Sequence, residues 1–227
     1  MLLMFSAVEC KGKQITSVTS RSTSQREVWD KIATGWTNWR QKSDPVAERL
    51  AAKWPPGKLL DIGCGNCRNL KPFVQMGFEC HGVDFSPKMI DIAKQFCRKN
   101  SMKVNLQVAD ADSLPFKPSS FNYVLSIAIL HHLETKEKRL KAVQEIKRVL
   151  KPGGKAFISV WNKLQWKFVF KPQDMFVPWQ RKGIKYMRYY HFFHHWELLR
   201  LIKSTGLKIE WFSGPFGRNL QFIVEKR

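Results

Sequence analysis

Residues 58–70 read KLLDIGCGNCRNL, a mostly apolar run that is followed by a glycine turn. The apolar residues within 59–62 predict a short strand that is buried on both faces. Gly63-Cys64-Gly65 predicts a tight turn, and residues 66–76 predict a helix that ends before Gly77. A strand, a glycine turn and a helix in this order place backbone N–H groups at a helix start, where a nucleotide-like ligand can approach closely.

Acidic residues stand at the ends of the strands that are predicted around this turn. Asp61 lies near the end of the first strand, a second strand at 79–83 ends at Asp84, and a third at 105–109 ends at Asp110. Rossmann-like folds bind a ribose diol with a carboxylate about twenty residues after the glycine turn. We therefore expect a cofactor site formed by Asp61, Gly63, Cys64, Gly65, Asp84, Phe85, Asp110, Ala111 and Ile127.

The order Asp-x-Gly-x-Gly, Asp84 and Asp110-Ala111 resembles the class I methyltransferases that use S-adenosylmethionine (SAM). No Gly-Lys-Ser/Thr follows the turn, as a nucleoside triphosphatase would require. Cys67 stands where the third glycine is usual, which disfavours a dinucleotide more than SAM, because SAM has no pyrophosphate. The resemblance implies a Rossmann-like α/β fold and SAM as the cofactor.

The rest of the chain continues the alternation of strands and helices. Further strands are predicted at 121–127, 156–160, 207–212 and 220–225, and further helices at 88–100, 136–150 and 196–204. This pattern predicts a seven-stranded, mostly parallel sheet with a C-terminal antiparallel hairpin. We expect a mobile leader over residues 1–25 and one methyltransferase domain over 26–227, with a helical lid at 26–56.

The composition points to a polyanionic partner inside a reducing compartment. Thirty-nine Lys and Arg against 18 Asp and Glu give a net charge of +21. This excess of cations is typical of nucleic-acid binding, although an anionic membrane surface or a generally basic proteome would also account for it. No apolar run is long enough to span a membrane, and five cysteines show no disulfide framework, so we expect a cytoplasmic protein with no membrane partner. Cys64 and Cys67 form one Cys-x-x-Cys pair without a second pair, so no metal site is expected.

Residues 161–190 depart from the alternation and combine cations with aromatic rings. This insert holds seven Lys and Arg, nine aromatic residues and one acid, Asp174. Cations for phosphates and flat rings for unstacked bases are what recognition of single-stranded RNA requires. The alternative is a loop whose rings pack into the core while its lysines are solvated.

Several segments together resemble the tRNA wobble-uridine carboxymethyl methyltransferases, over about residues 26–227. They are VWDKIA at 28–33, Trp39-Arg40, DIGCGN at 61–66, SIAILHH at 126–132, QDMFVPW at 173–179 and RYYH at 188–191. The resemblance implies methyl transfer to the carboxylate of 5-carboxymethyluridine at the wobble position of tRNA. It also implies a small zinc-containing activator subunit that covers the sheet edge formed by the strand at 105–109. Cys67-Arg68 departs from the Gly-Lys that is usual in this family.

Such a reaction depends on alignment of the acceptor with the methyl group and on desolvation. It needs no general base, because a carboxylate is already ionised at pH 7. Arg40, Arg188 or His191 is expected to hold the anionic acceptor, and His131 and His132 to close the cleft. We thus assign His131, His132 and Arg40 to catalysis. Substrate binding is assigned to Trp179, Lys182, Lys185, Arg188, Tyr189, Tyr190 and His191.

Two other functions remain open from the sequence. A small-molecule methyltransferase of the quinone or sterol type has similar motifs, but leaves the charge and the insert at 161–190 unexplained. A non-catalytic RNA-binding scaffold on the same fold would not need the intact Asp61, Asp84 and Asp110. The Asn/Asp-Pro-Pro-aromatic motif of amino-group methyltransferases is replaced by Ser126-Ile127-Ala128, which argues against an amine as the acceptor.

Overall fold

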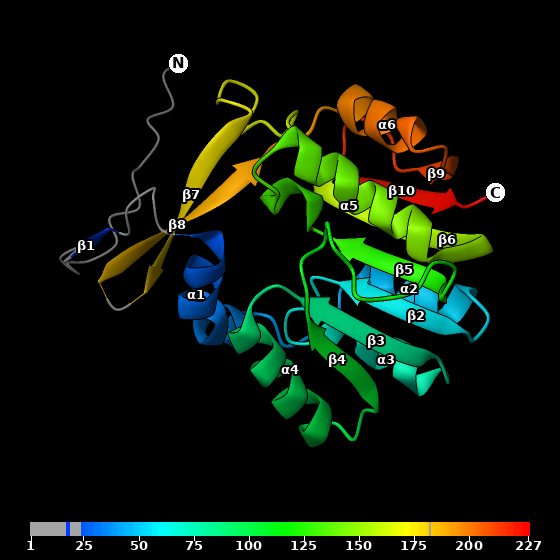
Figure 1. Cartoon of the computed structure of the whole chain (residues 1–227). Helices are drawn as coiled ribbons and strands as arrows, with labels where there is room; N and C mark the ends of the chain where they lie inside the picture. The colour runs from blue at the N-terminus through cyan, green and yellow to red at the C-terminus, as the bar shows by residue number, and fades with distance from the viewer. Residues whose placement is uncertain (1–16, 19–23, 182) are drawn as a thin grey trace, which may run out of the picture.

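The computed structural model describes residues 17–18, 24–181 and 183–227, and most of their strands lie in one sheet (Figure 1). The strand order is β4-β3-β2-β5-β6-β10-β9. The strands are β2 (Lys58–Ile62), β3 (Glu79–Asp84), β4 (Val104–Val108), β5 (Phe121–Ile127), β6 (Leu150–Trp161), β9 (Lys208–Phe212) and β10 (Asn219–Glu225). The first five pair in parallel, whereas β10 is antiparallel to both β6 and β9. The predicted seven-stranded, mostly parallel sheet with its C-terminal hairpin is confirmed.

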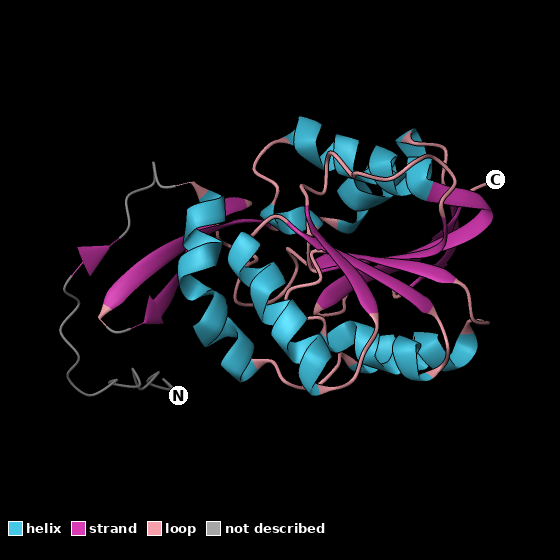
Figure 2. Cartoon of the chain, turned by 60° about the horizontal axis from the view of Figure 1, so that its bottom comes forward, coloured by secondary structure: helices cyan, strands magenta, loops and turns pink. Residues whose placement is uncertain are grey.

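Helices cover both faces of this sheet, which Figure 2 shows between two helical layers. On one face lie α2 (Pro45–Lys53), α3 (Lys71–Gln75) and α4 (Pro87–Lys99), and on the other α5 (Lys136–Val149) and α6 (His195–Ser204). Two 3-10 turns, η1 (Arg68–Leu70) and η2 (Leu130–His132), follow β2 and β5. None of the helices in the described part of the chain is both long and apolar enough to cross a bilayer.

The two successive leucines of β2 follow from this coverage, because helices lie on both faces of the strand. Leu59 packs in a cluster with α2 and α3, whereas the next residue, Leu60, packs in a separate cluster with α5 and α6. Both side chains are fully buried. A strand that is covered on both faces needs apolar residues at successive positions, as in the parallel sheets of α/β proteins.

The helix that was predicted directly after the glycine turn begins later than expected. Cys67 has a left-handed φ of 64°, which delays the start of regular helix. The chain first forms η1 and then the short α3, with Pro72 in its first turn, where a missing N–H is tolerated.

The insert at 161–190 contains a β-hairpin, which we did not predict. The hairpin pairs β7 (Asp174–Arg181) with β8 (Ile184–His191) in antiparallel fashion, and β1 (Ser17–Val18) pairs in parallel with β8. This small sheet lies beside α1 (Gln25–Trp39), at one end of the main sheet (Figure 1). Most of the leader at 1–25 lies outside the described residues, as does Lys182 in the turn between the two hairpin strands.

The helical segment at 26–56 is divided between two places. α1 packs against α4 and the hairpin, while α2 packs into the main core with its buried Val46, Leu50 and the following Trp54. Only α1 lies where a lid over the glycine turn was expected.

Candidate cofactor and acceptor site

The glycine turn after β2 has no room for side chains at two positions. Gly63 has a φ of +67°, and a Cβ added there would lie 2.0 Å from Cδ1 of Ile129. Gly65 has a φ of +53°, and its added Cβ would lie 3.1 Å from the ring of Trp36 on α1. Both positions combine a left-handed backbone with a close neighbour, so both require glycine.

Asp84, at the end of β3, holds the glycine turn with its carboxylate. Oδ2 accepts a hydrogen bond from the backbone N–H of Gly65 at 3.0 Å, and Oδ1 accepts one from that of Ser86 at 2.9 Å. Burial raises the pKa of Asp84 to about 6, despite the two backbone donors that lower it. Each carboxylate oxygen keeps a lone pair for a further donor, as a ribose hydroxyl would supply.

Two buried polar atoms lie near the carboxyl ends of the neighbouring strands β2 and β5. Oδ2 of Asp61 and Oγ of Ser126 form no hydrogen bond with any of the residues that the structure describes. Burial raises the pKa of Asp61 to about 8, although the nearby Arg68 lowers it. Buried polar groups are normally paired, so these atoms fit a ligand with hydrogen-bonding groups of its own, such as the amino acid part of SAM. Of the two, Ser126 was not predicted as a site residue.

The other predicted cofactor residues gather at the same end of the sheet, next to α1. Arg26 of α1 reaches both carboxylate oxygens of Asp110, at 3.0 and 2.9 Å, and donates to the carbonyl of Phe85 at 2.5 Å. Ala111 and Ile127 are half-buried. Arg26 was missed in the sequence because its partner lies 84 residues away.

His131 and His132 follow β5 and stand among aromatic rings. The backbone N–H of Trp161 donates to Nδ1 of His131 at 3.2 Å, and Nδ1 of His132 donates to the carbonyl of Tyr189 at 3.1 Å. Burial lowers the pKa of His131 well below its usual value and that of His132 to about 3. Both imidazoles are therefore neutral at pH 7.

Arg188 of β8 is a buried cation inside an aromatic cage. Its guanidinium carbon lies 5.9 Å from the ring centre of Trp29, 5.2 Å from that of Trp179 and 5.2 Å from that of Tyr190. Nη1 donates to the hydroxyl of Tyr190 at 2.8 Å, whereas the buried Nε has no hydrogen-bond partner in the described part of the chain. Within residues 24–181 and 183–227, no ion pair includes Arg188.

Arg40, at the C-terminal end of α1, is exposed and close to this cage. Its guanidinium carbon lies 5.4 Å from the ring centre of Trp36, and its charge lowers the pKa of Arg188 in addition to the larger effect of burial. The structure thus brings Arg40, Arg188, His131 and His132 into one region. Two cations that form no ion pair with the described carboxylates, beside two neutral imidazoles, make an environment that favours an anion.

The remaining predicted acceptor residues have structural contacts. His191 lies between two carboxylates, with Nδ1 2.8 Å from Asp174 and Nε2 2.7 Å from Glu197, so both ring nitrogens are engaged. Tyr189 bonds through its hydroxyl to Asp174 and to the carbonyl of Glu134. Lys185 lies on β8 opposite Gln180, and Lys182 is outside the described residues.

Comparisons with known proteins identify the family of this chain. The family model described as a methyltransferase domain matches residues 60–158. A tRNA (carboxymethyluridine(34)-5-O)-methyltransferase of Schizosaccharomyces pombe is 34% identical over 206 residues, which cover 79% of this chain and 86% of that protein. The probable tRNA methyltransferase 9B of Mus musculus is 34% identical over 155 residues, 68% of this chain but 33% of that protein.

Solved structures show the same fold. A SAM-dependent methyltransferase from Methanosarcina mazei superposes with a TM-score of 0.67 at 21% identity and covers 82% of this chain and 98% of that chain. A putative methyltransferase of Haloferax volcanii, solved in complex with the Trm112 methyltransferase activator, gives a TM-score of 0.66 at 17% identity. That match covers 89% of this chain and 97% of the neighbour.

Proposed function

We propose a reaction for this chain, which belongs to the family of the tRNA carboxymethyluridine methyltransferases: it methylates the carboxylate of 5-carboxymethyluridine at the wobble position of tRNA. When bound, SAM supplies a methyl group on a positively charged sulfonium. The residues at the ends of β2, β3 and β5, above all Asp61, Asp84 and Ser126, would hold this cofactor.

The buried Arg188 carries the proposal. A guanidinium that is removed from water is costly unless an anion pairs with it, and this one has no carboxylate partner among the described residues. A carboxylate matches the planar fork of Arg and forms charge-assisted hydrogen bonds with it. An amine as the methyl acceptor would present N–H donors to the guanidinium of Arg188. Because the guanidinium also has only N–H donors, an amine matches it less well than a carboxylate does.

The neutral histidines suit the same reaction. The acceptor carboxylate is ionised at pH 7, so no proton has to be removed from it. Because His132 donates from Nδ1 and is uncharged, it adds no positive charge beside a sulfonium. The work of the site is therefore to orient the acceptor and to exclude water.

Exposed aromatic rings support RNA as the carrier of the acceptor. Trp39 is 85% exposed and lies edge-on to Trp179, with ring centres 6.3 Å apart. Trp166 and Phe170, which are 84% and 88% exposed, form a second pair at 6.3 Å, next to the lysines at 167 and 171. Such rings are available to stack on unpaired bases, whereas Tyr189 and Tyr190 of the same insert are buried.

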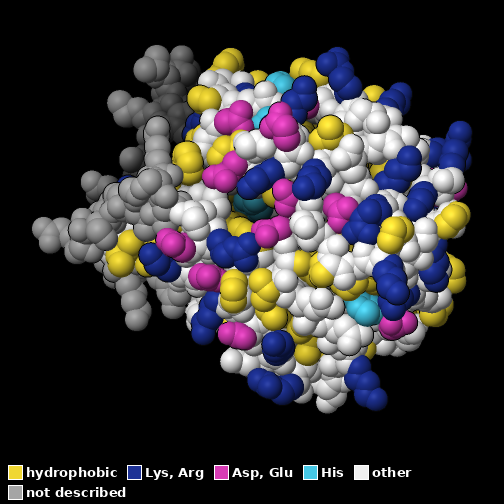
Figure 3. Space-filling view, in the orientation of Figure 1, with side chains coloured by type: hydrophobic (Ala, Val, Ile, Leu, Met, Phe, Trp, Pro, Cys, Tyr) yellow, Lys and Arg dark blue, Asp and Glu magenta, His cyan; other side chains and the backbone are white. Residues whose placement is uncertain are grey.

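Positive charge extends beyond these rings. Figure 3 shows Lys and Arg side chains spread over one face of the molecule, as a net charge of +21 requires. A surface of this sign attracts a polyanion at long range and gives an affinity that depends on salt.

The edge strand β4 supports a protein partner. Among the described residues β4 pairs only with β3, and Val108 at its end is 45% exposed. An unpaired edge with apolar side chains invites another strand. We propose that a small activator subunit, zinc-containing as the family resemblance implies, pairs with this edge.

The acceptor is tested by incubating the chain and its activator with methyl-labelled SAM and tRNA that carries 5-carboxymethyluridine. Nucleoside analysis should place the label in a methyl ester, which mild alkali hydrolyses to labelled methanol. Asp84→Ala should transfer much less label at a SAM concentration that does not saturate the variant. Label that resists alkali would contradict the ester and indicate transfer to nitrogen, carbon or ribose.

The RNA surface is tested by its salt dependence. The double variant Trp166→Ala/Phe170→Ala should weaken tRNA binding by about 1–3 kcal/mol for each unstacked base and leave the salt slope unchanged. Lys167→Ala/Lys171→Ala should instead flatten the slope of log K against log salt by about 0.7 for each lost phosphate contact. Trp211→Ala, which removes a partly exposed ring on β9 outside the insert, is the control. Binding of tRNA that does not depend on salt would favour a small-molecule substrate.

A further inference from the structure

Gln25, the first residue of α1, bonds to the backbone of β8 on both sides of Arg188. Its side-chain amide donates to the carbonyl of Met187 at 3.2 Å and accepts from the backbone N–H of Tyr189 at 2.8 Å. A side-chain amide has the same donor and acceptor as a peptide group, so Gln25 pairs with β8 as a neighbouring strand would. Both partners lie far away in the sequence, by 162 and 164 positions, so residue 25 was assigned to the leader from the sequence.

These bonds extend the support that β8 receives on the edge opposite β7. β7 pairs along one edge of β8, and the short β1 pairs along the other edge at Ile184 and Lys185. Three residues further on, the backbone at 187–189 bonds to Gln25, and the carbonyl of Tyr189 also accepts from Nδ1 of His132 at 3.1 Å. The backbone that carries Arg188 is therefore held by α1 and η2 as well as by β7.

The same helix also contacts the side chain of Arg188. Trp29 stands four residues after Gln25, one helical turn further along α1, and its ring centre lies 5.9 Å from the guanidinium carbon. Contacts with ring faces place a cation but do not fix the direction of its N–H groups. Of those groups, Nη1 donates to Tyr190, and Nε has no hydrogen-bond partner among the described residues. The direction in which the free N–H points thus depends on where β8 places the backbone.

α1 is attached to the cofactor region by its next residues. Arg26 bonds to both carboxylate oxygens of Asp110, at 3.0 and 2.9 Å. One turn further, Oδ1 of Asp30 accepts from the hydroxyl of Ser86 at 2.5 Å. Methyl transfer requires the acceptor to lie in line with the methyl group. A single helix therefore bonds both to the cofactor region and to the strand that carries Arg188.

We propose that Gln25 is a positioning residue, which aligns the guanidinium of Arg188 with the methyl group of the bound cofactor. The inference rests on the proposed function, because it takes Arg188 as the group that binds the acceptor carboxylate. Gln25 acts through β8 and not by contact with the acceptor. Without its amide the strand can shift at 187–189, and a displacement of about 1 Å at a reacting group can cost about a hundredfold in rate.

The test uses Gln25→Met, which keeps an unbranched stem and a similar helix propensity but removes the amide. With the activator and tRNA that carries 5-carboxymethyluridine, kcat should fall by about tenfold or more, whereas Kd for tRNA and for SAM should change by less than about twofold. Gln41→Met is the matched control, since this exposed amide bonds back to the carbonyl of Thr37, four residues earlier. Gln25→Asn, whose stem is one methylene shorter, repeats the test if the methionine variant unfolds.

Hydrogen exchange tests the contact itself, without tRNA. The backbone amide of Tyr189 donates to Gln25, so its exchange should become about tenfold faster or more in Gln25→Met. The Gln41→Met control should leave this rate unchanged.

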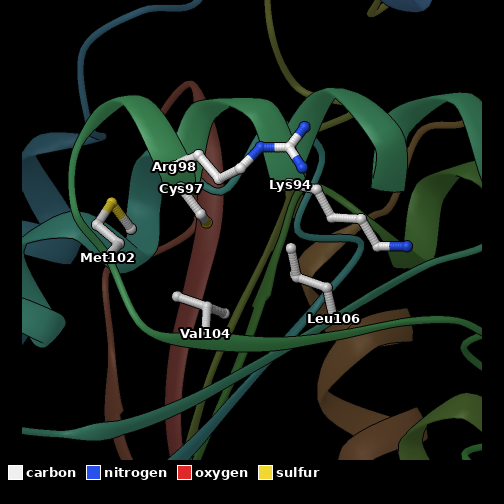
Figure 4. Close-up of a pocket in the computed structure, with 6 residues that line it drawn as sticks. All are labelled: Lys94, Cys97, Arg98, Met102, Val104 and Leu106. Atoms are coloured by element: carbon white, nitrogen blue, oxygen red, sulfur yellow. The ribbon is translucent and has the colours of Figure 1, made fainter.

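A double-mutant cycle shows whether Gln25 acts through Arg188. Once Arg188→Met has removed the guanidinium, Gln25→Met should lower kcat/KM by less than about twofold more. The control cycle pairs Gln25→Met with Arg98→Met. Arg98 lies on α4 and lines a pocket of about 270 Å³ between α4 and β4, to which α1 and β8 contribute no lining residue (Figure 4). In that cycle the two effects should multiply, because the two sites are independent.

Three results would overturn the inference. They are an unchanged kcat in Gln25→Met, an unchanged exchange rate at Tyr189, and effects of Gln25→Met and Arg188→Met that multiply. Full activity of Arg188→Met would contradict the proposed acceptor and this inference together. Full activity of Gln25→Met, beside a strongly impaired Arg188→Met, would contradict this inference alone.

Discussion

The cofactor region and the acceptor region of this molecule are held together in different ways. The cofactor region, at the ends of β2, β3 and β5, depends on contacts between nearby segments, such as Gly65 with Asp84, 19 residues apart. The acceptor region joins α1 to the hairpin, where the amide of Gln25 bonds to the backbone of Tyr189, 164 residues away, at 2.8 Å. A short motif can therefore indicate the first region, while the second exists only once the chain has folded.

The two regions also bury opposite charges. In the cofactor region the buried groups are the carboxyls of Asp61 and Asp84, and burial raises the pKa of each. In the acceptor region the buried charged group is the guanidinium of Arg188, beside the neutral His131 and His132. A ligand with hydrogen-bond donors and a positive charge suits the cofactor region, whereas an anionic ligand suits the acceptor region. A substitution in one region should therefore leave the binding of the other region's ligand unchanged.

The largest effect is expected from Arg188→Met, which keeps an unbranched apolar stem but removes the charged guanidinium. Loss of two charge-assisted hydrogen bonds to the acceptor should cost about 3 kcal/mol or more, so kcat/KM for tRNA should fall at least hundredfold. SAM affinity should stay within twofold. Arg200→Met, which removes an exposed cation of α6, is the control. If SAM affinity falls as far as activity does, the two regions are not separate.

Asp84→Ala is expected to have the opposite pattern, with SAM binding affected and tRNA binding unchanged. Loss of the bonds from a ribose diol, roughly 1.5–3 kcal/mol each, should weaken SAM binding at least tenfold in calorimetry. The affinity for tRNA should not change, because Asp84 is buried under the glycine turn. Asp91→Ala, an exposed position on α4, provides the comparison. Unchanged SAM affinity would remove Asp84 from the cofactor site.

A milder loss should appear when pH is lowered. Because burial raises the pKa of Asp84 to about 6, this carboxyl is mainly ionised at pH 7 and mainly protonated at pH 5. Protonation removes an acceptor of charge-assisted bonds, so SAM affinity should fall roughly tenfold over this range. Asp61, with a pKa of about 8, is mainly protonated throughout the range and adds little to the change. Calorimetry at pH 5, 6 and 7 measures the fall, and Asp84→Asn should make the profile flat.

The smallest effect is expected from Arg26→Ala, which breaks a connection between α1 and the cofactor region. The side chains of Arg26 and Asp110 are 40% and 50% exposed, and such pairs contribute about 0.2–1 kcal/mol. The free energy of unfolding in urea should fall by no more than this amount, and less at high salt. A loss above 2 kcal/mol would mean that Arg26 anchors α1 to the main domain.

The cofactor region was largely predictable because it depends on local order. The strand predicted at 121–127 has the observed bounds of β5, and the strand predicted at 105–109 is the edge strand β4, shifted by one residue. The glycine turn lies where residues 63–65 indicated, and its two left-handed glycines explain why this motif is specific. The later start of the helix after the turn was not predictable without the backbone angle of Cys67.

The acceptor region was not predictable to the same degree. Phe176, Trp179 and Tyr186 were counted in an insert for which no strand was predicted, and they belong to two paired strands. The number of aromatic rings and cations in the insert does not show which of these side chains are exposed. The structure buries Arg188 against Trp29 of α1 and Tyr190 in a cluster with Phe168 and Phe192. Trp166 and Phe170, on either side of Phe168, remain exposed.

The sequence by itself determined the fold class, the glycine turn and the acidic residues that follow the parallel strands. These features depend on the spacing of residues along adjacent strands, and parallel strands bring their carboxyl ends to one edge of the sheet. Only the tertiary structure decided that Arg188 is a buried cation without a carboxylate partner among the described residues. Burial and pairing arise when distant segments pack together, and no spacing within a single segment specifies them.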